Sequence, residues 1–426
     1  MWRNYKNSSI VLKMTIAFIA GLIVALILGE NAKFLEPLGQ ILIRLLNLIA
    51  IPIIFLTIVL SLSRINLAKL GRMGGKLFLY YSITTGLSVF IGVIIALTIN
   101  PGENLTLPKN SIDKPSIPSF SDILYKIIPD NFIKAFSSGE LLSILFIAIL
   151  LGISMSILLS SSDKSTQQKT ESLQSLFETL NKLFNIILNG ILLYAPIGVF
   201  GISASTFGSQ GLNSFKSLLS FTLTFYIGIL ILWLLVYFSF LKLANKPVWK
   251  FLKDTKEAYL TAFFTSSSIA SLPISIKSAK RANISNEVVN FSIPLGTIFN
   301  SDGGALRMGV SIVFATNVTG INLSLENLFM IVIIGTILSI GTSGIPAGGL
   351  ITLSAVLSLF GLPLEIVALI AGVDAIIGMG GTASNVLGDI IGAAVIDKKT
   401  KPITNFIVIA FVFLFILQSF HHQIED

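Results

Sequence analysis

The sequence predicts an all-α polytopic membrane protein with eight transmembrane helices and two re-entrant helical hairpins. Three observations predict this class. Of the 426 residues, 53% are hydrophobic and 12% are charged, and the mean hydropathy is +0.87, whereas soluble proteins carry about 25% charged residues. Long apolar segments follow one another along the chain, and two late ones are interrupted by small and polar residues. Lipid is therefore the expected solvent for most of the surface.

Six apolar segments come first, and each is long enough to cross about 30 Å of hydrocarbon. They cover 9–29, 36–63, 76–99, 138–160, 178–207 and 215–242. The first could be a signal peptide. No small-residue cleavage site leads into a polar domain, however, and further apolar segments follow at once, so we interpret it as a first spanning helix.

The basic residues indicate the orientation of these segments. Lys and Arg gather in the connections 64–76, 161–177 and 242–256, which places these connections in the cytoplasm. The proline-containing segment 101–122 has no basic excess and is expected outside. We therefore expect a multi-pass protein of the plasma (inner) membrane with a cytoplasmic N-terminus. The net charge of +8 is interpreted as a topology signal and not as a nucleic-acid surface.

Two later apolar segments change character partway along their length. Segment 258–281 contains the hydroxyl-rich run 265–268 and then Pro273, with basic residues at both ends, so it is expected to enter and leave on one side. Segment 327–359 is interrupted by the glycine-rich run 341–349. Two interrupted segments, each followed by a helix with polar residues, indicate an inverted repeat with binding near the midplane. A kinked ordinary crossing is the alternative for each segment.

The segment between these two, 286–316, carries an unusual polar run. Asn300 and Asp302 are two residues apart and cannot share one face of a regular helix. Unwinding at Gly303 and Gly304 would turn both side chains inward and free backbone carbonyl groups. A structural use of Asp302, hydrogen-bonded to backbone amides, is the alternative, but an intramembrane acid is functional by default.

The last polar segment carries a stripe of small and polar residues on one helix face. The stripe consists of Asp374, Gly378, Gly381, Thr382, Asn385 and Asp389. Carboxylate and amide oxygens from this stripe and from Asn300 and Asp302 suit a small, hard cation. The chain contains no cysteine, and its two histidines are His421 and His422 at the C-terminus, which argues against zinc or thiolate chemistry.

Four signatures occur together in the order typical of one known family. They are Thr265 to Ser268 with Pro273, Asn300-Ser301-Asp302-Gly303, Gly341 to Pro346, and Asp374 with Thr382, Asn385 and Asp389. In these signatures, and from Lys69-Leu70-Gly71-Arg72 and Tyr80-Tyr81 onward, the chain resembles the dicarboxylate/amino acid:cation symporters, the glutamate and neutral amino acid transporter family.

The resemblance implies a homotrimer in which a transport domain moves against a fixed scaffold like an elevator. The expected scaffold is 1–75 (helices 1 and 2) and 138–210 (helices 4 and 5). The expected transport domain is 76–100 (helix 3) and 211–396 (helix 6, both hairpins, helices 7 and 8). Residues 101–137 are expected to form an extracellular loop. The tail 397–426 contains an extra apolar run, 403–420, interpreted as a ninth crossing or a helix on the membrane surface.

The resemblance also implies sodium as a co-substrate and no cofactor. One sodium site would use Tyr81, Thr84, Thr85, Asn300 and Asp302. A second would use Gly296, Asn300, Asn385 and Asp389. A third would use backbone around Ile298 and Thr342. Ser301 stands where the family usually has Met, which is a departure beside the sites.

The substrate pocket departs further from the family pattern. The implied substrate contacts are Ser267, Ser268, Gly304, Ile345, Gly349, Asp374, Gly378, Gly381, Thr382 and Asn385. Gly381 replaces the arginine that holds a side-chain carboxylate, Gly378 replaces the aspartate that holds an ammonium group, and Ser266 and Gly304 replace two supporting positions. Losing a charged partner in a desolvated site costs a charged substrate about 2 to 5 kcal/mol. Glutamate and aspartate are therefore disfavoured.

Our main hypothesis from the sequence is a sodium-coupled symporter of a neutral amino acid, with its ammonium group held by Asp374 or Thr382. The alternative is a sodium-coupled mono- or dicarboxylate symporter, and another interpretation of Asp374 is a helix-packing residue without its arginine partner. An ion channel is a remote alternative, because these sites are assembled asymmetrically from one chain. An enzyme is not expected, since the sequence shows no metal-ligand cluster, nucleophile–base pair or phosphate-binding glycine motif.

Overall fold

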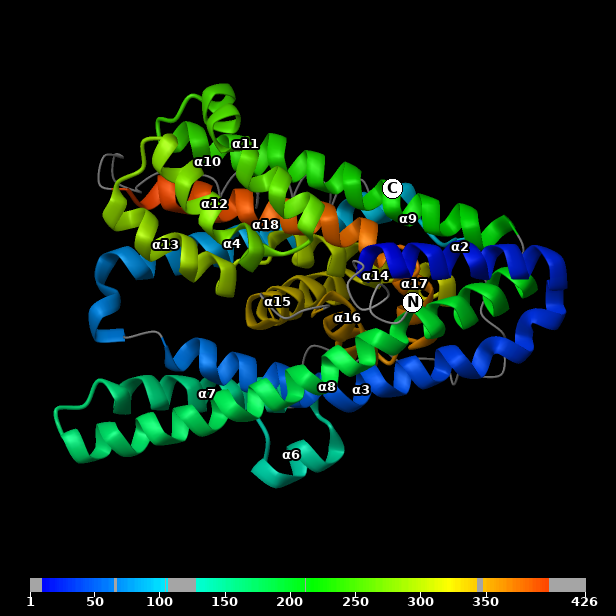
Figure 1. Cartoon of the computed structure of the whole chain (residues 1–426), viewed down its shortest axis with the longest axis horizontal. Helices are drawn as coiled ribbons and strands as arrows, with labels where there is room; N and C mark the ends of the chain where they lie inside the picture. The colour runs from blue at the N-terminus through cyan, green and yellow to red at the C-terminus, as the bar shows by residue number, and fades with distance from the viewer. Residues whose placement is uncertain are drawn as a thin grey trace, which may run out of the picture.

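The computed structural model describes residues 10–64, 67–103, 105, 128–210, 212–342 and 348–397 (Figure 1). Within these ranges every regular element is a helix. Among the described residues, five helical stretches are long and apolar enough to cross a membrane: Leu12–Ser63, Met73–Ile99, Lys164–Gly208, Phe215–Leu243 and Asp374–Ile396. The predicted all-α membrane class is confirmed, and the count of eight crossings and two hairpins stays a prediction.

One group of helices comes from the first half of the chain. It contains α2 (Ile10–Leu28), the 3-10 helix η1 (Gly29–Leu35), α3 (Glu36–Ser63), α7 (Leu141–Leu159) and α8 (Lys164–Gln210). α8 packs along α2 and α3, and α7 packs on α3 (Figure 1). Gly198 permits the close approach of α8 to α3, because a Cβ there would lie 2.5 Å from Cβ of Leu42. These helices cover most of the range expected for the scaffold.

The helix α8 begins earlier than the sequence predicted. The predicted connection 161–177 is wrong in its extent, because the chain is helical from Lys164. Asp163 caps this start by accepting hydrogen bonds from the backbone nitrogens of Ser165 at 3.0 Å and Thr166 at 3.3 Å. The Thr166 hydroxyl also donates to this carboxylate and holds the pKa of Asp163 below its usual value. A capped polar turn extends the helix beyond its apolar part.

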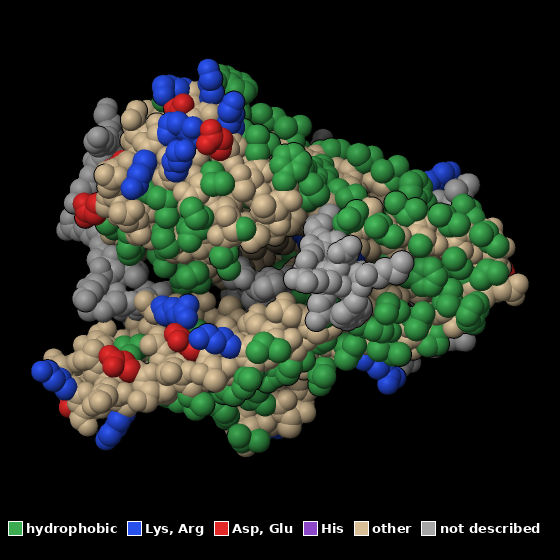
Figure 2. Space-filling view, viewed as in Figure 1, with side chains coloured by type: hydrophobic (Ala, Val, Ile, Leu, Met, Phe, Trp, Pro, Cys, Tyr) green, Lys and Arg blue, Asp and Glu red, His purple; other side chains and the backbone are tan. Residues whose placement is uncertain are grey.

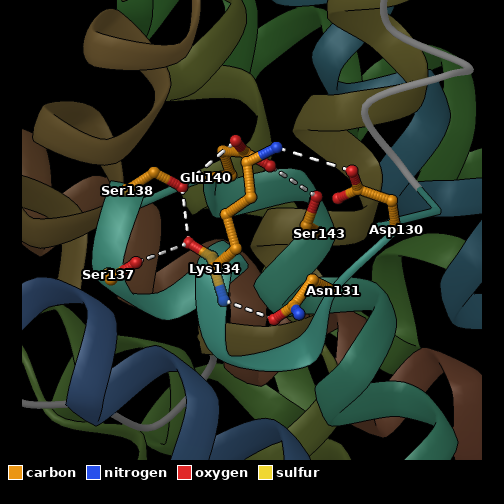
Figure 3. Close-up of polar contacts among 7 residues, drawn as sticks. All are labelled: Asp130, Asn131, Lys134, Ser137, Ser138, Glu140 and Ser143. Atoms are coloured by element: carbon orange, nitrogen blue, oxygen red, sulfur yellow. Dashed lines mark hydrogen bonds and ion pairs between the residues drawn. The ribbon is translucent and has the colours of Figure 1, made fainter.

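A short helix leads into α7 (Figure 3). This helix, α6 (Phe132–Ser138), begins after Asn131, whose Oδ1 accepts a hydrogen bond from the backbone nitrogen of Lys134 at 2.9 Å. The Lys134 ammonium group lies 3.4 Å from a carboxylate oxygen of Asp130. Gly139 ends the helix with a left-handed φ of 69°, which glycine adopts without steric cost. The rest of the predicted loop 101–137 lies largely outside the described residues.

A second group of helices surrounds α14 (Asp302–Thr319). α14 packs against α4 (Leu67–Ile99), α9 (Leu212–Ile231) and α18 (Asp374–Ile396), and nearly all of its side chains are buried. Because α4 begins at Leu67, the predicted connection 64–76 is also too long. The chain continues from α9 through a π-helical turn, η3 (Leu232–Tyr237), into α10 (Phe238–Leu243). Such π-helical turns are frequent at functional sites.

The first interrupted segment is two helices packed side by side. α11 (Val248–Thr265) ends at Ser266, which has a left-handed φ of 49°, and α12 (Ser268–Arg281) packs against α11 (Figure 1). At the end of α12, Nη1 of Arg281 lies 3.0 Å from Oε1 of Glu257 on α11. The two chain directions are therefore opposite. That this pair enters the membrane without crossing it stays a prediction.

The second interrupted segment is flanked by α15 (Leu325–Thr342) and α16 (Gly348–Leu359), which pack against each other. The residues between them, 343–347, lie outside the described residues. α17 (Glu365–Ala371) then leads into α18. The predicted extra helix at 403–420 and the rest of the tail beyond residue 397 also lie outside the described residues.

The surface of the molecule shows where charge and apolar area gather. In Figure 2, Lys and Arg side chains collect at the end where α10 meets α11, and at the end where α7 meets α8. Hydrophobic side chains cover much of the opposite part of this face, over α2, α3 and α9. The basic connections α7–α8 and α10–α11 lie toward the same end of the molecule, as the predicted topology requires. Which side of the membrane this end faces stays a prediction.

Candidate functional site

A break in the helical path lies at the centre of the candidate site. α13 (Asn286–Phe299) ends before Asn300, which has an extended conformation with φ −90° and ψ 123°, and α14 begins at Asp302. The prediction that Gly303 and Gly304 unwind is therefore wrong, because both lie in the first turn of α14. Gly303 instead packs directly on the backbone of Gly381, where any Cβ would overlap that backbone.

The carboxylate of Asp302 is fully buried and surrounded by hydroxyl groups. Thr84 and Thr85 of α4 each donate a hydrogen bond to its Oδ1 at 3.0 Å. The Tyr237 hydroxyl lies 2.8 Å from Oδ2 of Asp302 and 2.9 Å from the carbonyl oxygen of Ser384. Three elements, α4, η3 and α14, thus converge on one carboxylate.

A second carboxylate lies on the other side of Asn300. The amide Nδ2 of Asn300 donates to Oδ1 of Asp389 at 3.0 Å, and Asp389 is 1% exposed. Gly296 borders this carboxylate, since a Cβ there would lie 2.5 Å from Oδ1 of Asp389 and 2.6 Å from the Tyr81 hydroxyl. Asp302, Asp389, Asn300 and Tyr81 therefore occupy one buried region.

Asn385 links this region to the stripe on α18. Its Oδ1 accepts a hydrogen bond from the backbone nitrogen of Gly303 at 2.8 Å, and its carbonyl oxygen accepts one from Nδ2 of Asn300 at 2.8 Å. The structure thus brings Asn300, Asp302, Asn385 and Asp389 together. Each of these side chains carries an oxygen atom, and carboxylate and amide oxygens are ligands that suit a hard cation. The described part of the chain contains no group of three His, Cys, Asp or Glu residues that could hold a metal ion.

The rest of the stripe on α18 is partly accessible in an otherwise buried helix. Asp374, Gly378, Thr382 and Asn385 are all half-buried. The Thr382 hydroxyl donates to the carbonyl oxygen of Gly378 within the same helix at 2.7 Å. Around Gly378 there is open space, because a Cβ there would have no neighbouring atom within 4 Å.

Asp374 has an arginine partner that the sequence analysis missed. Nη1 of Arg307 on α14 forms an ion pair with Oδ1 of Asp374. The two side chains are 8% and 19% exposed, so the pair is largely buried. The interpretation of Asp374 as a packing residue that has lost its arginine partner is wrong about the partner, which Arg307 supplies, and its packing role stays a prediction. A Cβ at Gly349, at the start of α16, would also meet this guanidinium group.

The remaining predicted positions are placed with less contact to these groups. The Ser267 hydroxyl caps α12 by accepting from the backbone nitrogen of Ala270 at 3.2 Å, and Ser268 follows it, half-buried. A Cβ at Gly304 would meet only Ser301. Ile298 is partly buried in the last turn of α13. Thr342 ends α15, and neither its side chain nor Ile345 is among the described groups.

Comparison with known proteins gives the family of the chain. A profile described as the sodium:dicarboxylate symporter family matches residues 10–399. The chain belongs to this family. Similar curated proteins include the C4-dicarboxylate transport protein of Bacillus subtilis, which is 31% identical over 93% of this chain and 94% of that protein. The proteins of the same name from Solibacter usitatus and Rhizobium etli are 29% and 30% identical over 92% of this chain and 93% and 89% of theirs. The family resemblance found in the sequence is thus confirmed.

Two residues of this sodium:dicarboxylate symporter family member could have been found from weak sequence signals. Tyr237 is a phenol in an apolar span, and Arg307 is a lone charge in a segment of small residues. Polar groups in lipid-length segments are costly unless they are used or paired. Trp233, one turn before Tyr237, donates its indole N–H to the hydroxyl of Ser384 at 2.8 Å. A fluorescent group therefore lies next to Tyr237 and Ser384, which border Asp302.

Proposed function

We propose that this protein is a secondary active symporter that couples sodium entry to the uptake of a small dicarboxylate. The observation that carries the proposal is the convergence of Asp302, Asp389, Asn300 and Asn385 at the break between α13 and α14. Buried carboxylates without a basic partner are costly in a membrane protein. A bound monovalent cation would offset that cost, and its binding would be linked through Asn385 to the stripe on α18.

The proposed cation positions follow from the oxygen atoms. One sodium ion would lie near Asp302, with the hydroxyl groups of Thr84 and Thr85 turned toward it. Another would lie near Asp389, where the amide oxygen of Asn300 and carbonyl groups of the last turn of α13 supply further ligands. We favour sodium over protons because several oxygen atoms surround each position. A metal cation uses several oxygen ligands, whereas a proton binds to one oxygen atom.

The dicarboxylate replaces the neutral amino acid as the substrate we favour. The charged group expected to hold an ammonium ion is engaged elsewhere, because Asp374 pairs with Arg307. The relatives compared above are named C4-dicarboxylate transport proteins. Both observations support a substrate that carries carboxylates and lacks an amine, which was the alternative interpretation of the sequence. That the relatives are named transport proteins also supports a carrier over an enzyme.

The proposed movement follows the packing of the helices. α2, α3, α7 and α8 pack on one another, while α14 and α18 pack with α4, α9 and the α11–α13 region. The first group would be the scaffold of a homotrimer and the second the moving transport domain. The energetics are adequate: a tenfold sodium gradient supplies about 1.4 kcal/mol per ion, and each net charge moved adds about 2.3 kcal/mol per 100 mV. Two sodium ions would carry a dianion without net charge.

Uptake into proteoliposomes tests this function. The full chain would be reconstituted, and labelled succinate, pyruvate, lactate, alanine, serine and aspartate would be offered with and without an inward sodium gradient. We expect sodium-dependent uptake of the four-carbon diacid and little uptake of the amino acids. Sodium-dependent uptake of alanine or serine above that of succinate would overturn the assignment, and uptake of every solute without saturation would indicate a channel.

A further inference from the structure

The strongest unexplained feature outside the cation region is the guanidinium group of Arg307. Its side chain is 8% exposed, and one nitrogen, Nη1, pairs with Asp374. The other two nitrogens, Nε and Nη2, are buried and have no hydrogen-bond partner among the residues that the structure describes. A guanidinium group carries five N–H donors. A buried one that uses a single edge indicates that another acceptor belongs on the remaining edge.

The two unpartnered nitrogens have the arrangement that a carboxylate needs. Nε and Nη2 share one edge of the planar guanidinium group, and their N–H bonds on that edge are parallel. A carboxylate accepts two such bonds side by side, and this bidentate contact is stronger and more directional than a single hydrogen bond. Asp374 occupies the Nη1 side, and no described residue accepts a hydrogen bond from this edge.

The position of Arg307 places its side chain beside the stripe on α18. Arg307 follows Gly303 by four residues, so both lie on the same face of α14, and Gly303 packs on Gly381. From there the two helices run in opposite directions, since Arg307 reaches Asp374, which precedes Gly381 by seven residues. The side-chain pair therefore passes the level of Gly378, where the structure has open space instead of a side chain.

The geometry points to Arg307 as the residue that recognises the second carboxylate of the substrate, which rests on the proposed dicarboxylate function. Gly381 stands where the family resemblance implies an arginine on α18. Arg307 would supply that positive charge from α14 instead. One carboxylate of a four-carbon diacid would lie near Asn385, which contacts the first turn of α14 at Gly303. The other would bind the Nε–Nη2 edge of Arg307. Arg307 lies four residues after Gly303, which is about 6 Å along the axis of α14. Asp374 is the positioning residue that holds the guanidinium group from its other side.

This assignment makes a specific demand on substrate selectivity. A diacid has a carboxylate for the Nε–Nη2 edge, whereas its half-ester has the same carbon chain and only one carboxylate. The protein should therefore prefer succinate to monomethyl succinate by about 100-fold, because an unmet charge-assisted bidentate contact is costly in a desolvated site. Removing the guanidinium group should abolish that preference and leave the weak binding of the half-ester almost unchanged.

Competition against labelled succinate in proteoliposomes of the full chain measures this preference. Four variants would be compared with the wild type: Arg307→Gln, Arg307→Lys, the double variant Arg307→Gln with Asp374→Asn, and Arg64→Gln. The double variant removes both charges of the buried pair and avoids an uncompensated carboxylate, which favours folding. Arg64→Gln is the matched control, because it removes an arginine from an exposed ion pair with Glu178. Size-exclusion profiles in detergent show which variants fold.

The expected result is a loss of about 100-fold in the affinity for succinate in both Arg307→Gln variants, with the half-ester changed by less than about threefold. Arg307→Lys should keep part of the preference, because it keeps the charge without the two parallel donors. A folded variant without Arg307 that still prefers succinate to its half-ester overturns the assignment of Arg307. If the wild type shows no sodium-dependent succinate uptake, the proposed function fails instead, so the two failures are distinguishable.

Discussion

Replacing Asp302 with asparagine separates the charge of this buried side chain from its shape. The amide fills nearly the same volume, so the packing of α4 against α14 should be kept. Two of the three hydroxyl groups that lose a charged acceptor have a backbone acceptor at hand. Thr84 lies 3.4 Å from the carbonyl oxygen of Tyr81, and Tyr237 lies 2.9 Å from that of Ser384. The expected loss of folding free energy is therefore about 1 to 3 kcal/mol.

The expected loss of cation affinity is larger than this loss of stability. Removing the charged partner of a buried ion costs about 2 to 5 kcal/mol. This range corresponds to an increase of about 30-fold to several thousandfold in the sodium concentration that gives half-saturation. The variant should therefore fold and bind sodium poorly, whereas a purely structural Asp302 would leave sodium binding unchanged.

The fluorescence of Trp233 offers an assay close to the cluster. Its indole N–H donates to Ser384, whose carbonyl oxygen lies 2.9 Å from the Tyr237 hydroxyl. The chain has three tryptophans, so replacing Trp2 and Trp249 with phenylalanine leaves one reporter. Sodium titrations would compare this background with and without Asp302→Asn, and Asp130→Asn, at an exposed ion pair, is the matched control. Half-saturation of a folded Asp302→Asn variant within about threefold of the background would refute the reasoning.

Four further substitutions test other parts of the account. Tyr237→Phe removes the hydroxyl group that lies beside Asp302 and should weaken sodium binding about 5- to 10-fold. An unchanged sodium titration curve would contradict a role of Tyr237 in cation binding. Gly296→Ala places a Cβ 2.5 Å from Asp389 and should lower thermal stability and succinate uptake. Gly190→Ala meets open space and should stabilise α8 by about 0.4 to 1 kcal/mol. Equal effects of the two glycine variants on stability would contradict the tight packing at Gly296. Arg64→Gln should change the unfolding free energy by less than about 1 kcal/mol, and a larger loss in chemical denaturation would show a stronger pair.

The positions of the long helices were predictable from the sequence because lipid sets their length. Expected spans 9–29 and 36–63 correspond to Ile10–Leu28 and Glu36–Ser63. Helix ends in water were less predictable, since α8 begins at Lys164 in a polar segment with no apolar signal. Capping by Asp163 and tertiary packing decide such ends, and neither has a long-range pattern in the sequence.

The cluster of Asn300, Asp302, Asn385 and Asp389 was predictable in its members and only partly in its geometry. Asn300 and Asp302 stood out as polar groups in an apolar segment, and the break between α13 and α14 lies at Asn300 and Ser301. The predicted role of Gly303 and Gly304, unwinding of the helix, is wrong. Gly303 serves the close contact with Gly381, and a glycine needed for packing looks the same in a sequence as one needed for backbone freedom.

The charge of the substrate pocket could not be predicted from positions on α18 alone. Gly378 and Gly381 indicate a pocket that has lost both charges, and this led to the neutral amino acid hypothesis. The charged partner of Asp374 lies on α14, about 70 residues earlier in the chain. Only the packing of α14 against α18 shows that Arg307 reaches Asp374. A single sequence carries no signal for such a contact between distant segments.

The most direct test of the central claim is the affinity of the purified protein for succinate, measured by calorimetry with and without sodium. Asn385 contacts both Gly303 and Asn300, so the account predicts that the two ligands bind cooperatively. Sodium should lower the dissociation constant of succinate at least about tenfold, and succinate should strengthen sodium binding by the same factor. Equal affinities for succinate in sodium and in a matched choline buffer would contradict the claim that this cluster couples a cation to the carried carboxylate.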